Sequence, residues 1–371
     1  AEIKKAVSIP VGAVTYMDPA RDPEFFESLI ASGELDFILM NRPLSVDYDY
    51  LHKLEEGRID EIRPCTRCMH CHWDAADDGN LTFSCRTNAA HPFRFVTGQL
   101  TGSYDPEPAA TAKNVVVVGA GPAGLEAARV AAERGHSVTL YEKKGSVGGL
   151  LEFANNVKGP HENLSVLRSY FERQMEVLGV NVMLNTEATA DIIAEASPDI
   201  VIAATGGVRD TLGLSDTAGT KVVGIDDFMM ADIAEEVVIV GSNVQAIDAA
   251  MYLLAQGKHV QVVTPNAASA IGAGHSFWVK TFTQPNMKAL GVRFWPEATV
   301  TAVNDGSVTV KTATGIEQEI ACGTVVEALD CLPNDNLSTG LSCEVVTVGD
   351  AARPFNIGEA ICSGNAAARA I

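Results

Sequence analysis

One pattern occurs twice in this chain, and it constrains the fold more than any other feature. An apolar strand, a tight turn and a helix with apolar periodicity lead into a second strand at 114–142, and the same order returns at 236–264. Two copies of a strand–helix–strand unit predict two parallel-sheet domains of the kind that binds a nucleotide at the turn. A length of 371 residues, 47% of them apolar, allows two or three hydrophobic cores.

The turn of the first unit has glycines in the pattern that a dinucleotide requires. Gly119, Gly121 and Gly124 lie directly between strand and helix, so the backbone and the helix N-terminus can approach a pyrophosphate closely. Glu142 ends the next strand, where a carboxylate can accept hydrogen bonds from ribose hydroxyls. The other residues predicted around this site are Pro122, Ala123, Lys143, Gly148 and Gly149.

The turn of the second unit departs from that pattern. It reads GSNVQA at 241–246, with Asn243 at the position of the middle glycine. Asparagine tolerates left-handed backbone angles, but its side chain occupies space that a pyrophosphate would approach. The next strand ends at Thr264 rather than at an acidic residue or an arginine, so no preference between NAD and NADP is predicted. The unit either binds NAD(P)H, at Gly241, Asn243 and Ala246, or is purely structural.

Four of the eight cysteines are crowded into one segment: Cys65, Cys68, Cys71 and Cys85. Crowding of this kind in a cytosolic enzyme favours metal binding over disulfides. Three cysteines at short consecutive spacings, with a fourth after a longer loop, favour a 4Fe–4S cluster held by thiolates. A structural zinc ion is the alternative, because three histidines lie nearby: His70, His72 and His91. The other cysteines are scattered and suit small buried apolar positions: Cys322, Cys331, Cys343 and Cys362.

Charge and hydropathy exclude several classes of function. The formal net charge of -20 argues against nucleic-acid binding, because a phosphate backbone selects basic faces. The sequence has neither a long uninterrupted apolar run nor the basic-then-apolar start of a secretory signal. We therefore expect a cytoplasmic protein without membrane association. A disulfide oxidoreductase is disfavoured, since no close cysteine pair lies in the two nucleotide-binding units.

The order of these features resembles one family. It is similar to that of the iron–sulfur flavoenzymes that include 2,4-dienoyl-CoA reductase, enoate reductases and trimethylamine dehydrogenase. The resemblance implies FAD at the first turn, with Asp350 of a Gly-Asp pair at the ribityl or pyrophosphate region and the helix after Asn356 directed at the flavin. The cofactor contacts implied near the ends of later strands and the start of the last helix are Thr205, Gly206, Gly349, Asp350, Asn356 and Ile357.

The resemblance also implies a further domain. In that family an N-terminal (β/α)8 barrel of the old yellow enzyme type binds FMN and substrate, and the cluster carries electrons between FMN and FAD. Residues 1–62 are similar only to the last two strand–helix units of such a barrel. Arg42 falls where the family places a phosphate-binding Gly-Arg pair, with Asn41 in place of the glycine. We expect the missing barrel portion or a partner subunit, and an oligomer, and we predict no catalytic residue within this chain.

The predicted architecture is α/β, with the end of a (β/α)8 barrel, a 4Fe–4S cysteine segment and two Rossmann-like nucleotide-binding domains. The barrel end spans 1–62, the cysteine segment 63–95 and a linker 96–112. The FAD-binding domain combines 113–225 with 323–371, and the NAD(P)-binding-like domain spans 226–322.

Three functions fit these expectations. In a reductase, NAD(P)H reduces FAD, and the cluster passes electrons to FMN, which reduces an activated C=C bond of an enoate or of an enoyl- or dienoyl-CoA. The helix at 248–253 resembles this branch, which we favour. The cysteine spacing and Asn243 instead resemble amine dehydrogenases or N-demethylases that deliver electrons to an electron-transfer flavoprotein. The third possibility is a noncatalytic electron-transfer subunit that docks on a separate barrel subunit.

Overall fold

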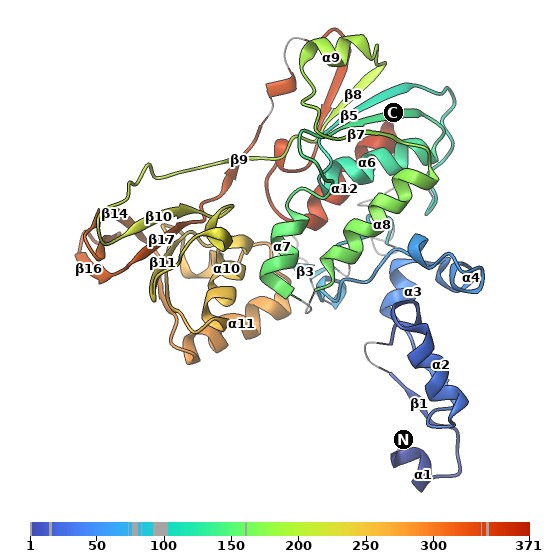
Figure 1. Cartoon of the computed structure of the whole chain (residues 1–371), viewed down its shortest axis with the longest axis horizontal. Helices are drawn as coiled ribbons and strands as arrows, with labels where there is room; N and C mark the ends of the chain where they lie inside the picture. The colour runs from blue at the N-terminus through green and yellow to red at the C-terminus, as the bar shows by residue number, and fades with distance from the viewer. Residues whose placement is uncertain are drawn as a thin grey trace.

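The computed structural model describes residues 2–14, 17–72, 74–75, 81–82, 84–91, 103–159, 162–334, 336–338 and 341–371. Part of the predicted linker at 96–112 and part of the predicted cysteine segment at 63–95 lie outside these residues. The described part forms an N-terminal arm, a cysteine segment and two sheet-based domains (Figure 1). No helix within it is both long enough and apolar enough to cross a membrane.

The first domain is built on a five-stranded parallel sheet in the order β19-β8-β5-β6-β7. Residues 115–118 of its central strand are all valine and all buried, as expected for a parallel strand that is covered on both faces. The strands are β5 (Asn114–Val118), β6 (Ser137–Tyr141), β7 (Asn181–Met183), β8 (Ile200–Ala203) and β19 (Glu344–Thr347). The helices are α6 (Pro122–Glu133), α7 (Leu151–Lys158), α8 (Leu164–Val177), α9 (Ala190–Glu195) and α12 (Ile357–Ala370), and α12 packs against α6.

The second domain repeats this design with its own parallel sheet, in the order β10-β17-β11-β12-β13, and adds an antiparallel meander, β14-β15-β16. Its parallel strands are β10 (Lys221–Gly224), β11 (Glu236–Val240), β12 (His259–Val263), β13 (Arg293–Trp295) and β17 (Thr324–Glu327). The meander consists of β14 (Ala298–Asn304), β15 (Ser307–Thr312) and β16 (Glu317–Ala321). The helices are α10 (Val244–Ala255) and α11 (Phe277–Ala289).

The chain passes between the two domains at a pair of short strands. β9 (Val208–Arg209) leads out of the first domain, β18 (Cys331–Leu332) leads back, and the two pair in antiparallel fashion. The predicted FAD-binding domain included β10 and β17, yet both strands form their hydrogen bonds in the second sheet. The sequence of a short apolar strand does not indicate which sheet the strand joins. The assignment of β10 and β17 to the second sheet therefore required the structure.

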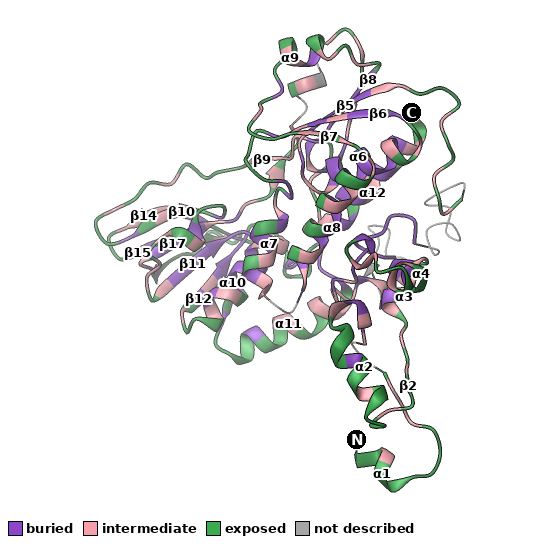
Figure 2. Cartoon of the chain, turned by 45° about the vertical axis from the view of Figure 1, so that its right-hand side comes forward, coloured by how far each residue is buried: buried purple, intermediate pink, exposed green. Residues whose placement is uncertain are grey.

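The N-terminal arm contains the two predicted strand–helix units in a reduced form. β1 (Gly12–Ala13) pairs in parallel with β2 (Phe37–Ile38), and the helices are α1 (Glu2–Ala6), α2 (Pro23–Ala31), α3 (Arg42–Val46) and α4 (Tyr50–Glu55). The arm extends away from both domains (Figure 1), and much of its surface is exposed (Figure 2). Its exposed large apolar side chains include Ile9, Phe25, Phe37, Leu39 and Leu51. Two such strands do not make a barrel.

Candidate functional site

The first glycine turn leaves open space at the start of α6. A Cβ at Gly119 would overlap the carbonyl oxygen of Ala204, and a Cβ at Gly124 would overlap the carbonyl oxygen of Gly119, so these two glycines allow close packing of turn, strand and helix. A Cβ at Gly121 would meet no described atom within 4 Å. No side chain among the described residues caps α6, so the N–H groups of its first turn border a space that an anion can enter.

Glu142 is tied into the loops around this turn. One carboxylate oxygen accepts a hydrogen bond from the backbone N–H of Ala120 at 2.8 Å. The other accepts one from the backbone N–H of Lys144, also at 2.8 Å. The predicted Gly148–Gly149 pair lies at the same place, because Gly148 N–H donates to the carbonyl oxygen of Ala120 at 2.8 Å. The structure thus brings the glycine turn, Glu142 and the glycine pair together as the sequence predicts.

The Gly-Asp pair lies beside the same helix. A Cβ at Gly349 would lie 2.7 Å from the Cβ of Ala123, in the first turn of α6. The Gly349 N–H donates to the hydroxyl of Ser363 at 2.9 Å. Asp350 accepts a hydrogen bond from the Phe355 N–H at 3.2 Å, and its burial raises the pKa of the carboxyl group.

The remaining predicted contacts border the same edge of the first sheet. Thr205 and Gly206 follow β8, and the Thr205 hydroxyl donates to the carbonyl oxygen of Asn334 at 3.3 Å. Asn356 caps α12 by accepting from the Glu359 N–H at 3.0 Å. These residues and the glycine turn all follow the carboxyl ends of parallel strands, where ligands bind in open α/β sheets. Their individual roles in cofactor binding stay predictions.

The second glycine turn is closed by the protein itself. The Asn243 side chain accepts from the Ala246 N–H at 2.9 Å and so caps α10. Its amide group donates to the carbonyl oxygens of Ala328 and Leu329 and to the Asp330 carboxylate, each at 3.1 Å. The first turn of α10 therefore has a side-chain cap in Asn243. The corresponding residue before α6 is Gly121, which has no side chain and cannot cap the helix in this way.

A segment that sequence reasoning missed covers the second turn as well. Gly272 donates to the carbonyl oxygen of Ser242 at 2.7 Å, and Ala273 forms a parallel bridge with Asn243. A Cβ at Gly274 would lie 2.7 Å from the side chain of Val244, so the segment approaches α10 closely. The run IGAG at 271–274 holds the glycines that this close approach needs, and it is the signal that could have revealed the cover.

The four predicted cluster ligands line one pocket: Cys65, Cys68, Cys71 and Cys85. Arg42, predicted for an FMN phosphate, lines this pocket too, and its guanidinium donates to the sulfur of Met69 at 3.3 Å. Burial raises the pKa of Cys65 and of Cys71 to about 12 and also raises that of Cys68. Among the described residues, no three His, Cys, Asp or Glu side chains are arranged as a site for a metal ion.

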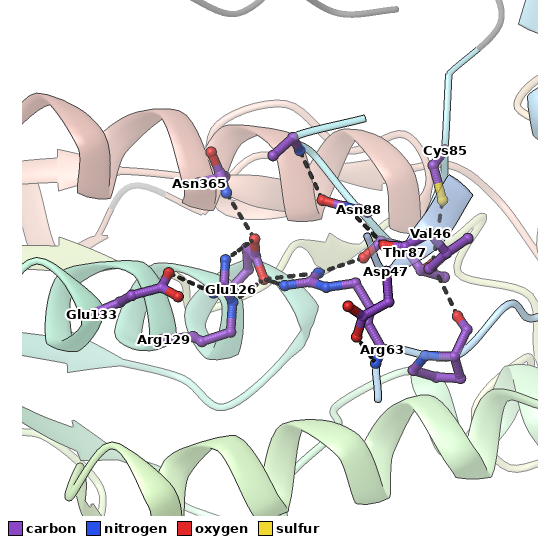
Figure 3. Close-up of polar contacts among 12 residues, drawn as sticks. Val46, Asp47, Arg63, Cys85, Thr87, Asn88, Glu126, Arg129, Glu133 and Asn365 are labelled. Atoms are coloured by element: carbon purple, nitrogen blue, oxygen red, sulfur yellow. Dashed lines mark hydrogen bonds and ion pairs between the residues drawn. The ribbon is translucent and has the colours of Figure 1, made fainter. Parts of the chain in front are cut away.

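A buried ionic network joins the cysteine segment to the first nucleotide helix (Figure 3). Arg63 donates to the Glu126 carboxylate through two nitrogens at 3.2 Å each, and to the carbonyl oxygen of Thr87 at 2.6 Å. Arg129 and Asn365 also donate to Glu126, at 2.9–3.0 Å and 2.8 Å. Burial alone would raise the pKa of Glu126, but the charges of Arg129 and Arg63 lower it to about 2.

A second buried chain of charges joins the other end of the cysteine segment to the second domain. Arg86, next to Cys85, pairs with Glu162, and Lys158 bridges Glu162 at 3.1 Å and Asp248 of α10 at 2.9 Å. His275 contacts Asp248 at 3.0 Å. Despite burial, the neighbouring cations lower the pKa values of Glu162 and Asp248 to about 2.

Glu126 and Asp248 occupy the same position in the two units, five residues after Gly121 and Asn243 respectively. Each is an acidic residue inside an apolar helix, and each is buried. Sequence reasoning did not assign either of them a partner. A carboxylate in an apolar helix face is the signal that could have found both, because a buried charge requires a paired cation.

Comparison with known proteins places the chain in a family. Residues 113–350, which contain both glycine turns, match the family described as pyridine nucleotide-disulphide oxidoreductase. The chain belongs to this family. It is an oxidoreductase with the α/β nucleotide-binding fold of flavoproteins and an FAD- and NAD(P)-binding architecture.

Relatives of this oxidoreductase are longer proteins. It is 37% identical over 268 residues to an NADH oxidase of Thermoanaerobacter brockii, covering 71% of this chain and 40% of the relative. It is similar over its whole length to a solved 2-naphthoyl-CoA reductase, with 30% identity and a TM-score of 0.84, and covers 55% of that chain. A histamine dehydrogenase from Rhizobium sp. 4-9 matches with 25% identity and a TM-score of 0.78, and the chain covers 59% of it.

These relatives confirm the resemblance to the iron–sulfur flavoenzyme family. They include both a reductase and an amine dehydrogenase, the two branches of the predicted iron–sulfur flavoenzyme family. The chain spans 40–59% of the length of these three relatives.

Proposed function

We propose that this oxidoreductase carries electrons between FAD at the first glycine turn and a 4Fe–4S cluster at the cysteine pocket, in the NAD(P)H-dependent reduction of an activated C=C bond. The substrate class is an enoate or an enoyl- or dienoyl-CoA, reduced at an FMN on the complete (β/α)8 barrel. The observation that carries this proposal is the Arg63–Glu126 network, which fixes the cysteine segment on α6. Because α6 starts at the glycine turn, this network would keep the two proposed redox sites at a fixed separation.

The residues at the first turn suit FAD. Gly121 leaves space for the pyrophosphate at the start of α6. Each oxygen of Glu142 accepts one hydrogen bond from the loops, which leaves capacity for ribose hydroxyls. Asp350 and the first turn of α12 complete the same edge. A bound flavin supplies an acceptor for hydride that releases single electrons, which allows a flavin and a cluster to work in series.

The cysteine pocket suits a cluster. The four thiols line one cavity, and a 4Fe–4S cluster takes four thiolates, each bound to a different iron atom. The raised pKa values belong to thiols without a bound cation, and a bound metal centre deprotonates its ligands. The neighbouring side chains of Arg42, Arg67 and Arg86 line the pocket and offset part of the thiolate charge.

The N-terminal arm supports a partner surface. Large apolar side chains such as Phe25, Phe37 and Leu39 are 43–50% exposed there, and an edge of this kind is normally covered. We propose that the remainder of a (β/α)8 barrel covers it, either in the same polypeptide or as a separate subunit. In the second case this chain is a noncatalytic electron-transfer subunit. The mass of the intact native protein, compared with that of this chain, distinguishes the two arrangements.

Anaerobic stopped-flow absorbance tests the proposed function. The holoprotein is mixed with NADH, and separately with NADPH, while the flavin and iron–sulfur bands are recorded. We expect both bands to bleach with one nucleotide, and a Cys85→Ala variant to bleach only in the flavin band. Failure of both nucleotides to bleach a protein that dithionite reduces fully would reject the NAD(P)H-dependent assignment.

One observation favours a second candidate, an amine dehydrogenase or N-demethylase that delivers electrons to an electron-transfer flavoprotein. Asn243 and the segment 272–274 fill the space beside the second glycine turn, and an enzyme that takes no electrons from NAD(P)H has no need of that space. In the same experiment this candidate predicts bleaching by an amine substrate. The reoxidation step would then depend on the concentration of the flavoprotein acceptor.

A further inference from the structure

Arg86 lies between the cysteine pocket and the flavin end of the first domain. It follows Cys85, is 5% exposed and lines the pocket. On its other side, a Cβ at Gly358 in the first turn of α12 would lie 3.2 Å from the Cγ atom of Arg86. The first turn of α12 is the part of that helix that the family resemblance directs at the flavin. Arg86 is therefore placed along the proposed route between the two redox centres.

The guanidinium of Arg86 is only partly satisfied by the protein. One terminal nitrogen pairs with Glu162. Its Nε atom is buried and has no hydrogen-bond partner among the described residues. A buried N–H without an acceptor costs about 1–3 kcal/mol, so native structures normally give such a group a partner. Arg86 also lines the cysteine pocket, where a bound cluster would offer sulfur atoms as acceptors.

We propose that Arg86 is a positioning residue of the cysteine pocket, whose Nε–H donates to a sulfur of the bound cluster and whose charge stabilises the cluster after it accepts one electron. This inference rests on the cluster in the proposed function. The cluster gains one negative charge on reduction and loses it when the electron leaves, and no bond to Arg86 forms or breaks. In a buried site, a cation beside that charge acts through little solvent, so its effect on the reduction equilibrium is large.

Glu162 sets the strength of this effect. Its carboxylate contacts both Arg86 and Lys158, and Lys158 is in turn held by Asp248 of the second domain. Glu162 offsets part of the Arg86 charge at the pocket. Removal of the carboxylate charge should therefore act in the opposite direction from removal of the Arg86 charge. This difference in sign separates an electrostatic role from loss of structure, which would disturb both variants alike.

A redox titration followed by electron paramagnetic resonance tests the inference on the holoprotein, after iron and sulfide analysis. Arg86→Gln should lower the equilibrium constant for one-electron reduction at least tenfold, about 59 mV in midpoint potential. Glu162→Gln should raise the potential, and Arg86→Lys should keep most of the wild-type value. Arg58→Gln, at a partly exposed arginine outside the pocket, is the matched control and should cause no shift.

The outcomes separate this inference from the proposed function. If the wild-type protein contains no iron and sulfide, the proposed cluster is rejected, and the role of Arg86 is rejected with it. If the wild-type protein contains a cluster, and the Arg86→Gln variant has full iron content and an unchanged midpoint potential, only the role of Arg86 is rejected. If Arg86→Gln does not retain a cluster, Glu162→Gln decides: a raised potential supports the inference, and an unchanged or lowered one overturns it.

Discussion

The two nucleotide-binding units are built to the same plan and differ at the one place where a ligand would bind. In each, a five-residue strand precedes a twelve-residue helix and another five-residue strand. Each helix also buries one acidic residue at the same position, Glu126 or Asp248. At the turns, Gly121 leaves the start of α6 open, whereas Asn243 caps α10 and the segment 272–274 covers it.

This difference shows that the fold of such a unit and its access to a ligand have separate causes. Apolar strands and a paired buried acid are present in both units, so the fold does not require an open turn. Access depends on whether the first N–H groups of the helix already have a partner in the protein. A match to the family pattern therefore identifies the fold of the second unit but leaves its ligand to experiment.

The largest expected effect tests the buried acids. Glu126→Gln should lower the free energy of unfolding by about 3–5 kcal/mol, because it leaves Arg63 and Arg129 buried beside an uncharged partner. Asp248→Asn should cost less, since Lys158 keeps its contact with Glu162. Urea denaturation followed by fluorescence measures both. Glu133→Gln, at the solvent side of Arg129, is the control and should cost under about 1 kcal/mol. Equal losses of unfolding free energy in Glu126→Gln and Glu133→Gln would contradict this prediction.

Acid should weaken the same contacts. The folded pKa values of Glu126, Glu162 and Asp248 are about 2, below their ordinary values of 4.5 and 3.8. The stabilisation is therefore complete above about pH 5 and is lost as the pH falls toward 2, by roughly 3 kcal/mol for each glutamate and roughly 2 kcal/mol for Asp248. Denaturation midpoints at pH 7, 5 and 3 measure this loss. The stability of the Glu126→Gln variant should depend less steeply on pH. An unchanged slope of stability against pH would show that Glu126 does not contribute to the loss of stability in acid.

An asparagine transferred to the first turn should close it. Gly121→Asn places a side chain in the open space and offers α6 its own cap, so FAD affinity should fall at least 100-fold, about 2.8 kcal/mol. Titration of the apoprotein with FAD, read by quenching of flavin fluorescence, measures the change. Gly213→Asn, an exposed loop glycine with a positive φ of 65°, is the matched control. Undiminished FAD affinity in Gly121→Asn would place the cofactor elsewhere.

The reverse substitution should have the smallest effect. Asn243→Gly removes the side-chain hydrogen bonds of Asn243 to Ala246, Ala328 and Leu329 and should cost about 1 kcal/mol of stability. NADH affinity should rise less than tenfold, because residues 272–274 still cover the turn. Calorimetry with NADH and a thermal melt measure the two quantities. A marked fall in NADH affinity would instead show that the Asn243 side chain itself contacts the bound nucleotide.

The sequence predicted what depends on neighbours along the chain. The first turn, Glu142 and the Gly148–Gly149 pair meet as expected because each follows a strand of the same unit. The pairing of Arg63 with Glu126 spans 63 residues, and that of Lys158 with Asp248 spans 90, so no local pattern could reveal either. The position of β10 and β17 in the second sheet was missed for the same reason.

The connection through β9 and β18 has a consequence for synthesis of the chain. β8 and β19 are neighbours in the first sheet, yet residues 210–330 lie between them and contain the whole second sheet. On a ribosome the second domain can therefore fold while the first sheet still lacks β19, since domains generally fold as units. Until α12 emerges, the face of α6 that it covers stays open, and this interval is when the nascent chain most needs protection from aggregation.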